Sequence, residues 1–327
     1  MKIIMPIAGK GTRLRPHTHV VPKSLIRVAG KPIINYIMDQ IQGINFSDII
    51  FIIGHLGDQI RGYLTENYQF PMRFIRQIDF HGLGHAIFQA RDAFPKDEPI
   101  LILLGDIIFT MNVHDIMKAE TNMLGVMKVA DPRSYGIVMT DENGIVTNMM
   151  EKPEKPPTNI AIAGIYYFQS AHKLFASIEH IIREKIMTRG EYQLTDAMKH
   201  MMYNGEKFKT FDVPEWYDCG EKDSLLDTNR VMLDRYATND RVSGSIVIPP
   251  VFIGNNCDIR NSILGPNVSI SEGSTVVNSI ISNSILGIET SVENTILESS
   301  LIGDNAFLAE KPREFNIGPD SEMIFTK

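Results

Sequence analysis

The residues with the clearest chemical potential lie in the first loop of the chain, where glycines and basic residues follow an apolar run. Gly9 and Gly11 end that run, and glycine lets backbone N–H groups approach an anion closely. Arg13, Arg15 and Lys23 add fixed positive charge nearby. This combination predicts a phosphate-binding loop.

Two common phosphate-binding motifs do not fit this loop. A P-loop requires a glycine at the position of Ile4 and a Ser or Thr at the position of Gly11. A dinucleotide-binding loop requires a glycine at the position of Leu14. For the loop taken alone, a glycine-rich turn with solvated bases remains the alternative.

Composition is that of an ordinary globular protein. With 327 residues, the chain is long enough for two domains and a sizeable core. Its 43% hydrophobic and 22% charged content are typical of such proteins. The net charge of −7 gives no electrostatic footprint for nucleic acid or an anionic membrane, so we expect neither as a partner.

Cysteine usage and hydropathy indicate a cytoplasmic setting. Cys219 and Cys257 are too few and too far apart for a disulfide scaffold or a cysteine metal cluster. No stretch approaches the roughly 20 apolar residues that cross a bilayer. The N-terminal apolar run leads into the glycine loop without a cleavage-like site, so it is expected to be the first strand.

Strand and helix signals alternate in the first part of the chain, which predicts an α/β fold with a mostly parallel sheet covered on both faces. Ligands of such sheets lie at the carboxyl ends of the strands. The glycine loop and Asp106 would both lie there. The expected strands are 48–54, 72–77, 100–106 and 161–168, and the expected helices are 32–41, 86–91, 174–187, one beginning within 190–196, and 224–236.

Beyond Asn239 the composition changes to Ile, Val, Ser, Asn and Gly, and aliphatic residues recur every five or six positions. That period fits neither a helix nor an alternating strand, but it fits a β-helix with one short strand per face. A tail from Glu310 onward is expected to cap the coil. The aliphatic positions are Ile253, Ile259, Leu264, Ile270, Val276, Ile281, Leu286, Val292, Leu297, Ile302 and Leu308.

Six short blocks occur in the order found in the sugar-1-phosphate nucleotidyltransferases, which this chain resembles. The resemblance implies a Rossmann-like nucleotidyltransferase domain over 1–238 and a left-handed β-helix over 239–327. This architecture is similar to that of long thymidylyltransferases and ADP-glucose pyrophosphorylases. The blocks are Gly9 to Arg13 with Lys23, Gln77 with 82–86, Gly105 with Asp106, Glu151 to Pro153, Ala163 to Tyr166, and Trp216 to Gly220.

The resemblance implies attack by a sugar-1-phosphate oxygen on the α-phosphorus of a nucleoside triphosphate, with release of pyrophosphate. Such a transfer needs charge neutralisation and alignment more than an acid or base. Arg13 would hold the β- and γ-phosphates, and Lys23 the α-phosphate. Asp106 and Asp218 would hold Mg²⁺, which prefers carboxylate oxygens. His85 is expected to be structural, because this chemistry needs no general base.

Further residues are expected to bind the two substrates. Gln77 offers a donor and an acceptor that fit a pyrimidine edge. Lys152 would bind the sugar phosphate while Glu151 accepts hydrogen bonds from sugar hydroxyls; the alternative is a charged turn. The expected nucleotide-binding residues are Ala8, Gly9, Gly11, Thr12, Gln77, Gly82 and Asp106, and the expected sugar-phosphate-binding residues are Gly136, Glu151, Lys152, Gly164 and Tyr166.

The choice of nucleotide stays open between UTP and dTTP. The short glycine loop resembles that of bacterial UTP–glucose-1-phosphate uridylyltransferases, whereas the β-helix is more like that of long thymidylyltransferases. The two nucleotides differ by a methyl and a hydroxyl, and a pocket distinguishes one methyl by only about 1–3 kcal/mol. ATP or GTP, as used in ADP-glucose or GDP-mannose synthesis, is less favoured.

Other classes of protein fit less well. An acyltransferase acting on the β-helix would need a catalytic histidine, and none follows His200. A regulatory or scaffold subunit should have lost site residues. The β-helix is expected to support contacts in a homo-oligomer or to stiffen the first domain. The candidate site residues that a regulator should lack but this chain retains are Arg13, Lys23, Asp106, Lys152 and Asp218.

Overall fold

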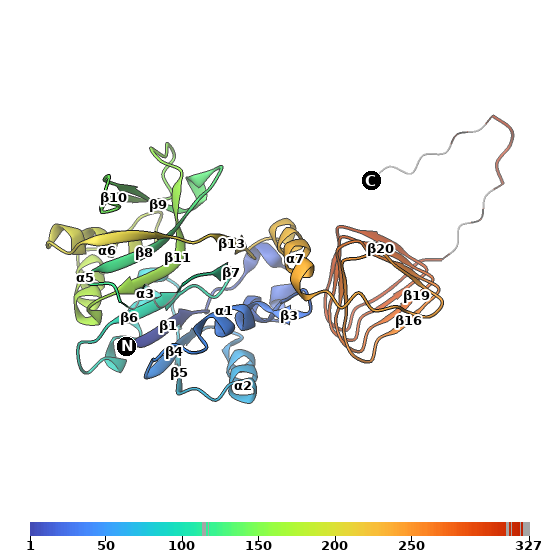
Figure 1. The fold of residues 1–327 in the computed structure, drawn as a ribbon, viewed down its shortest axis with the longest axis horizontal. Coiled ribbons are helices and arrows are strands. Elements are labelled where there is room, and N and C mark those ends of the chain that lie inside the picture. The colour runs from blue at the N-terminus through green and yellow to red at the C-terminus, as the bar shows by residue number, and fades with distance from the viewer. Residues whose placement is uncertain (113–115, 117, 312–313, 315, 321, 323–327) are drawn as a thin grey trace. The chain divides into compact units, whose positions relative to one another are not determined.

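The computed structural model describes the whole chain except residues 113–115, 117, 312–313, 315, 321 and 323–327. Two compact units are present, Met1–Thr228 and Asn229–Lys327 (Figure 1). In the part of the chain that the structure describes, no helix is long and apolar enough to span a membrane.

The first unit is built on a mixed sheet of nine strands. β1 (Lys2–Pro6) lies between the parallel strands β4 (Asp48–Ile53) and β6 (Ile100–Leu103). β5 (Met72–Arg76) continues the parallel part beside β4, and β11 (Ile160–Phe168) pairs antiparallel with β6. The carboxyl ends of β1 and β6 are therefore neighbours, which brings together the loops that follow them.

Short strands complete the first unit. The main path of the sheet has the order β10-β9-β11-β6-β1-β4-β5, β8 pairs with both β11 and β12, and β13 pairs with β7 outside this sheet. None of these added strands was predicted from the sequence. Their bounds are Arg27–Val28 (β2), Lys31–Pro32 (β3), Ile107–Thr110 (β7), Asn122–Lys128 (β8), Gly136–Thr140 (β9), Val146–Glu151 (β10), Phe208–Asp212 (β12) and Glu215–Asp218 (β13).

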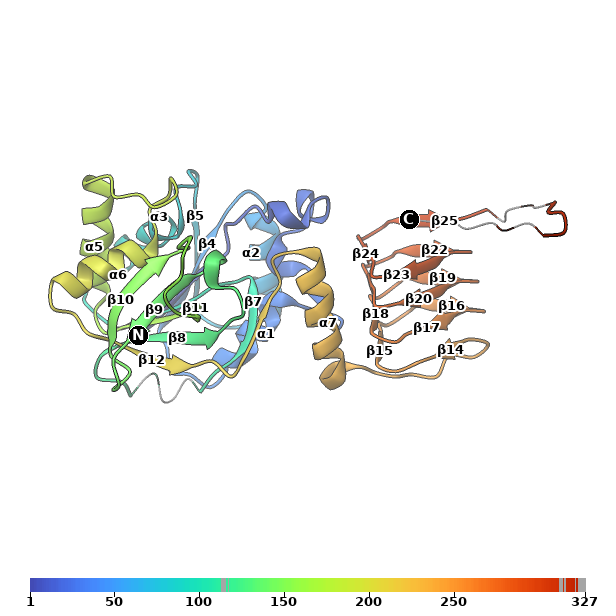
Figure 2. The ribbon, with the colours of Figure 1, turned by 90° about the horizontal axis from the view of Figure 1, so that it is seen from above.

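Helices cover both faces of the sheet, and each face has its own apolar core. The residues of α1 and α2 pack on one face and those of α3, α5 and α6 on the other (Figures 1 and 2). The predicted helices are present, with α3 and α5 each starting three residues earlier than expected, while α2 was not predicted. The helices are Ile33–Ile41 (α1), Gly57–Asn67 (α2), Leu83–Phe88 (α3), Ala171–Arg183 (α5), Leu194–Tyr203 (α6) and Lys222–Tyr236 (α7).

The second unit is a parallel β-helix with three faces, which Figure 1 shows along its axis and Figure 2 from the side. Three sheets of four strands each form the faces, so the predicted fold class is confirmed. The strands of the three faces are Ile246–Val247, Ile263–Leu264, Ile280–Ser282 and Ile296–Glu298 (β14, β17, β20, β23); Val251–Ile253, Val268–Ile270, Ile285–Leu286 and Leu301–Ile302 (β15, β18, β21, β24); and Asp258–Arg260, Thr275–Val277, Ser291–Glu293 and Phe307–Ala309 (β16, β19, β22, β25).

The interior of the β-helix holds the aliphatic residues that the period predicted. Leu264, Val276, Ile281, Leu286 and Val292 are fully buried in one cluster. Asparagines with positive φ recur outside the strands. Half of the predicted capping tail from Glu310 onward falls on residues outside those that the structure describes, and the cap stays a prediction.

Candidate functional site

Two adjoining cavities lie in the first unit. One of about 450 Å³ is lined by the glycine loop, and one of about 300 Å³ is lined by residues 134–136, 151–152, 162–164 and 166. Every residue that the resemblance assigned to the site lines one or both cavities, whereas Arg15 of the glycine loop lines neither. The residues common to both are Arg13, Leu83, Leu104, Asp106 and Glu191.

The glycine loop leaves β1 and forms one wall of the larger cavity. Gly11 has φ +58°, and a Cβ there would lie 2.8 Å from the Cγ2 atom of Thr18. The Thr18 hydroxyl donates a 2.7 Å hydrogen bond to the Gly11 carbonyl, which fixes the turn. A Cβ on Gly9 would meet nothing within 4 Å, so this part of the loop is open to a ligand.

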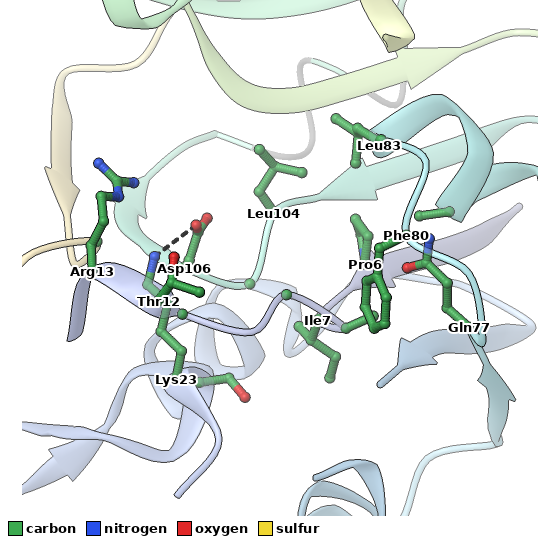
Figure 3. A pocket seen from close by; sticks show the side chains of 18 of the residues that line it. Pro6, Ile7, Thr12, Arg13, Lys23, Gln77, Phe80, Leu83, Leu104 and Asp106 are labelled. Atoms are coloured by element: carbon green, nitrogen blue, oxygen red, sulfur yellow. Dashed lines mark hydrogen bonds and ion pairs between the residues drawn. The ribbon is translucent and has the colours of Figure 1, made fainter. Parts of the chain in front are cut away.

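The charged end of the larger cavity contains two cation–carboxylate pairs. The Nζ atom of Lys23 lies 2.8 Å from the Oδ2 atom of Asp106, as Figure 3 shows, and the Lys23 side chain is largely buried. Arg13 Nη1 lies 2.5 Å from Glu221 Oε1, and both of these side chains are exposed. Both basic residues thus line the cavity beside the glycine loop.

Asp218 ends β13 and reaches the smaller cavity. Burial raises the pKa of its carboxyl group, and the negative charge of Asp106 raises it further, while Lys23 opposes the shift. The backbone N–H of Gly220 donates a 2.8 Å hydrogen bond to Oδ1 of Asp218. A partly buried carboxylate beside a second carboxylate is a site where added positive charge is favourable.

The opposite end of the larger cavity carries the residues expected to meet the base. Gln77 is 6% exposed, its backbone N–H donates to Ile53 O, and its side-chain amide donates a 3.0 Å bond to Asp79 O. Gly82 has φ +99°, and a Cβ there would lie 2.8 Å from the carbonyl oxygen of Tyr192. Only glycine allows the backbone at position 82 to come this close to Tyr192. The start of α3 therefore lies beside the cavity.

The smaller cavity contains the residues expected to bind the sugar phosphate. The Thr195 hydroxyl donates a 2.7 Å hydrogen bond to Oε2 of Glu151, and Lys152 Nζ lies 3.7 Å from Oε1 of the same carboxylate. Burial raises the pKa of Tyr166, with a further contribution from Glu151, so its phenol stays protonated. A Cβ on Gly136 would lie 3.0 Å from Glu151 Oε2, so its absence leaves the carboxylate accessible.

His85 lies outside both cavities. Its ring packs edge-on against His81 with a centroid separation of 5.0 Å, and its buried Nδ1 has no hydrogen-bond partner among the described residues. Burial, with a contribution from His81, lowers the pKa of His85. The expectation that His85 is structural stays a prediction.

Several residues at the two cavities were not predicted from the sequence. Phe80, Glu191 and Thr195 line the cavities, and Glu221 pairs with Arg13. Glu191 and Thr195 belong to a segment that was interpreted only as the start of a helix. Phe80 carried a signal that could have been used, since it is an aromatic residue within the six-residue stretch that joins Gln77 to Gly82. The pairing of Glu221 with Arg13 joins positions 208 residues apart and had no sequence signal.

Comparison with known proteins gives matches over most of the chain. A family model described as nucleotidyl transferase matches residues 1–235. The chain is 31% identical to the bifunctional protein GlmU of Methanocaldococcus jannaschii, over 97% of this chain and 84% of that protein. It is 27% identical to a glucose-1-phosphate thymidylyltransferase of Streptomyces antibioticus, over 93% and 92% of the two chains.

Two further matches concern proteins named for a uridine nucleotide. The chain is 29% identical to the UTP–glucose-1-phosphate uridylyltransferase AglF of Haloferax volcanii, over 66% of this chain and 89% of that protein. A crystal structure of UDP-glucose pyrophosphorylase complexed with UDP-glucose superposes on 72% of this chain and 98% of its own, with a TM-score of 0.62 and 22% identity. The structural match shows a shared fold.

Proposed function

The chain belongs to the nucleotidyl transferase family, and we propose that it transfers a nucleotidyl group from UTP or dTTP to a sugar 1-phosphate, with glucose 1-phosphate the favoured acceptor. The products are an NDP-sugar and pyrophosphate. The observation that carries this proposal is the pair of adjoining cavities that share Arg13 and Asp106. One cavity offers a phosphate loop, and the other offers Glu151 and Lys152, as a transfer between two substrates requires.

In this proposal Arg13 and Lys23 are the catalytic cations. Arg13 holds the β- and γ-phosphates, and Lys23 holds the α-phosphate. A sugar-phosphate oxygen attacks the α-phosphorus as the bond from that phosphorus to the bridging oxygen of the β-phosphate breaks. The attacking oxygen is already anionic, so no proton has to be removed. The larger cavity binds the nucleotide through Ala8, Gly9, Gly11, Thr12, Gln77, Gly82 and Asp106, and the smaller binds the sugar phosphate through Gly136, Glu151, Lys152, Gly164 and Tyr166.

Members of this family generally use a divalent metal ion, and we propose Mg²⁺ held by Asp106 and Asp218. The donors fit, because both carboxylates line the smaller cavity and Asp218 pairs across two strands with Ile107, the residue that follows Asp106. Among the described residues no group of three or more His, Cys, Asp or Glu side chains could hold a metal, so substrate phosphates and water would complete the coordination. When bound, the ion would neutralise phosphate charge.

The test is pyrophosphate release measured over a grid of nucleoside triphosphates and sugar 1-phosphates in the presence of Mg²⁺. We expect turnover with UTP or dTTP and glucose 1-phosphate, and weaker turnover with ATP or GTP. Turnover restricted to ATP or GTP would overturn the pyrimidine assignment. Absence of turnover in every combination would favour a non-catalytic regulatory or scaffold subunit.

The proposal extends to domain organisation and assembly. Residues 1–238 form the catalytic domain, and residues 239–327 form the β-helix that supports a homo-oligomer in the cytoplasm. Support comes from a row of isoleucines on one face, Ile246, Ile263, Ile280 and Ile296, of which Ile246, Ile280 and Ile296 are 58%, 43% and 73% exposed. Light scattering of the full chain carrying Ile280→Lys should show a smaller species than the wild-type chain, and an unchanged size would count against this role.

A further inference from the structure

The larger cavity has two chemically different ends. Arg13 and Lys23 stand at one end, while Phe80 and Gln77 stand at the other, with Ile7 between them (Figure 3). The charged end suits the triphosphate, and the edge of Gln77 suits a base. Neither the basic residues nor the edge of Gln77 would contact the flat face of that base.

Phe80 is the side chain best placed for this contact. It lines the cavity, yet it is 40% exposed, in the segment between β5 and α3. A large aromatic ring that is exposed inside a ligand cavity offers contact area that a bound ring can cover. Ile78, two residues earlier, is even more exposed but does not line the cavity, so it provides a matched control.

Lys10 links Phe80 to the glycine loop. Its Nζ atom lies 5.0 Å from the centroid of the Phe80 ring, a cation–π contact between the phosphate-binding loop and the base end of the cavity. An exposed contact of this kind is weak, so it biases the orientation of the ring without locking it.

We propose that Phe80 stacks on the pyrimidine ring of the bound nucleotide and that Lys10 positions the Phe80 ring from the glycine loop. The inference rests on the proposed function, because it describes how the nucleotide substrate of that same cavity is held. Stacking on an aromatic side chain is tolerant of base identity, since every base has a flat π-face. Phe80 therefore increases affinity for the nucleoside, while the polar edge contacts of Gln77 remain responsible for the choice of base.

The test compares two ligands that differ by the nucleoside. Binding of UTP and of inorganic tripolyphosphate to the full-length protein is measured by calorimetry for the wild type, Phe80→Ala, Phe80→Tyr and Ile78→Ala. We expect Phe80→Ala to weaken UTP binding about 10-fold and to leave tripolyphosphate binding unchanged. Phe80→Tyr and Ile78→Ala should match the wild type. Equal loss of both ligands, or no loss of UTP affinity, would overturn the stacking role.

A double-mutant cycle tests the positioning role of Lys10. Lys10→Met should lower the ratio of UTP to tripolyphosphate affinity a few-fold in the wild-type background and leave that ratio unchanged in the Phe80→Ala background. An equal effect in both backgrounds would show that Lys10 does not act through Phe80. A chain that binds UTP with this dependence on Phe80 but releases no pyrophosphate would overturn the proposed function and leave the stacking role intact.

Discussion

The two units of this chain differ in whether their sequence pattern repeats. The β-helix repeats one environment on each coil, as when Ile263 pairs with Ile280 and Ile280 with Ile296. The first unit uses each element once, and its charged site residues, such as Arg13 and Lys23, lie in short turns. A repeat produces a regular apolar core, whereas a binding site requires chemically different side chains close together. From this difference we expect that replacing a site residue leaves the fold intact, and that replacing a core residue of the coil leaves the site intact.

The largest expected effect is on the chemistry of the first unit. Asp218→Asn should lower kcat about 10³-fold, equivalent to about 4 kcal/mol, because it removes one of two carboxylates proposed to hold Mg²⁺. Steady-state pyrophosphate release measures this effect. Asp212→Asn, at an exposed position of β12, is the control and should keep full activity. Undiminished turnover in Asp218→Asn would remove Asp218 from the site.

The pKa of Asp218 predicts that this loss of activity comes without a loss of stability. Its folded-state pKa lies above the ordinary value of 3.8, so ionisation opposes folding. The destabilisation is absent below the ordinary pKa and develops as pH rises through the folded-state pKa. Asp218→Asn should therefore match or exceed the wild type in Tm at neutral pH.

The second largest effect is a loss of stability, and it comes from a substitution in the core of the β-helix. Leu286 is fully buried in the core of the β-helix, and Leu286→Ala should lower the free energy of unfolding by about 3 kcal/mol through lost burial and a cavity. Denaturant titration measures this change. Leu301→Ala, at a partly exposed position in the next coil, should have a smaller effect. A large change in KM for either substrate in Leu286→Ala would show that the core of the β-helix affects substrate binding in the first unit.

Elements of the first unit with a strong hydrophobic pattern could be predicted from the sequence, and elements with a weak pattern could not. The apolar runs of β4 and β6 were correctly assigned because strands buried on both faces carry few polar residues. By contrast, β9 and β10 were missed because antiparallel strands with mixed exposure contain Thr, Asn and Met and show no clean alternation. In α2, buried Ile60 and Leu64 are too few to give a helical period.

The same limit applies to the site. Gly9, Asp106 and Lys152 belong to short motifs, so their assembly around two adjoining cavities could be anticipated. Thr195 and Glu221 could not, since each acts through one partner that only folding brings near. A residue whose role depends on one long-range contact leaves no local pattern in the sequence.

The third effect separates the two cavities within the first unit. Glu151→Gln should raise KM for the sugar 1-phosphate about 30-fold, or about 2 kcal/mol, because a charged acceptor for sugar hydroxyls is lost. KM for the nucleotide should change little, since Glu151 lines only the smaller cavity. Initial-rate kinetics with each substrate varied in turn measures both constants. An equal rise in both KM values would mean that the cavities do not bind the substrates separately.

The smallest effect concerns the backbone of the coil. Asn278 has φ +49°, and its side-chain amide donates a 3.1 Å hydrogen bond to Oδ1 of Asn294 in the next coil. Asn278→Ala should lower the free energy of unfolding by about 1 kcal/mol, because alanine tolerates the left-handed region poorly and the hydrogen bond is lost. Asn278→Gly loses the same bond but accepts the backbone angle, so it should be less destabilising when both are compared by denaturant titration. If alanine and glycine were equally destabilising, the hydrogen bond between Asn278 and Asn294, and not the backbone angle, would be the reason for asparagine at position 278.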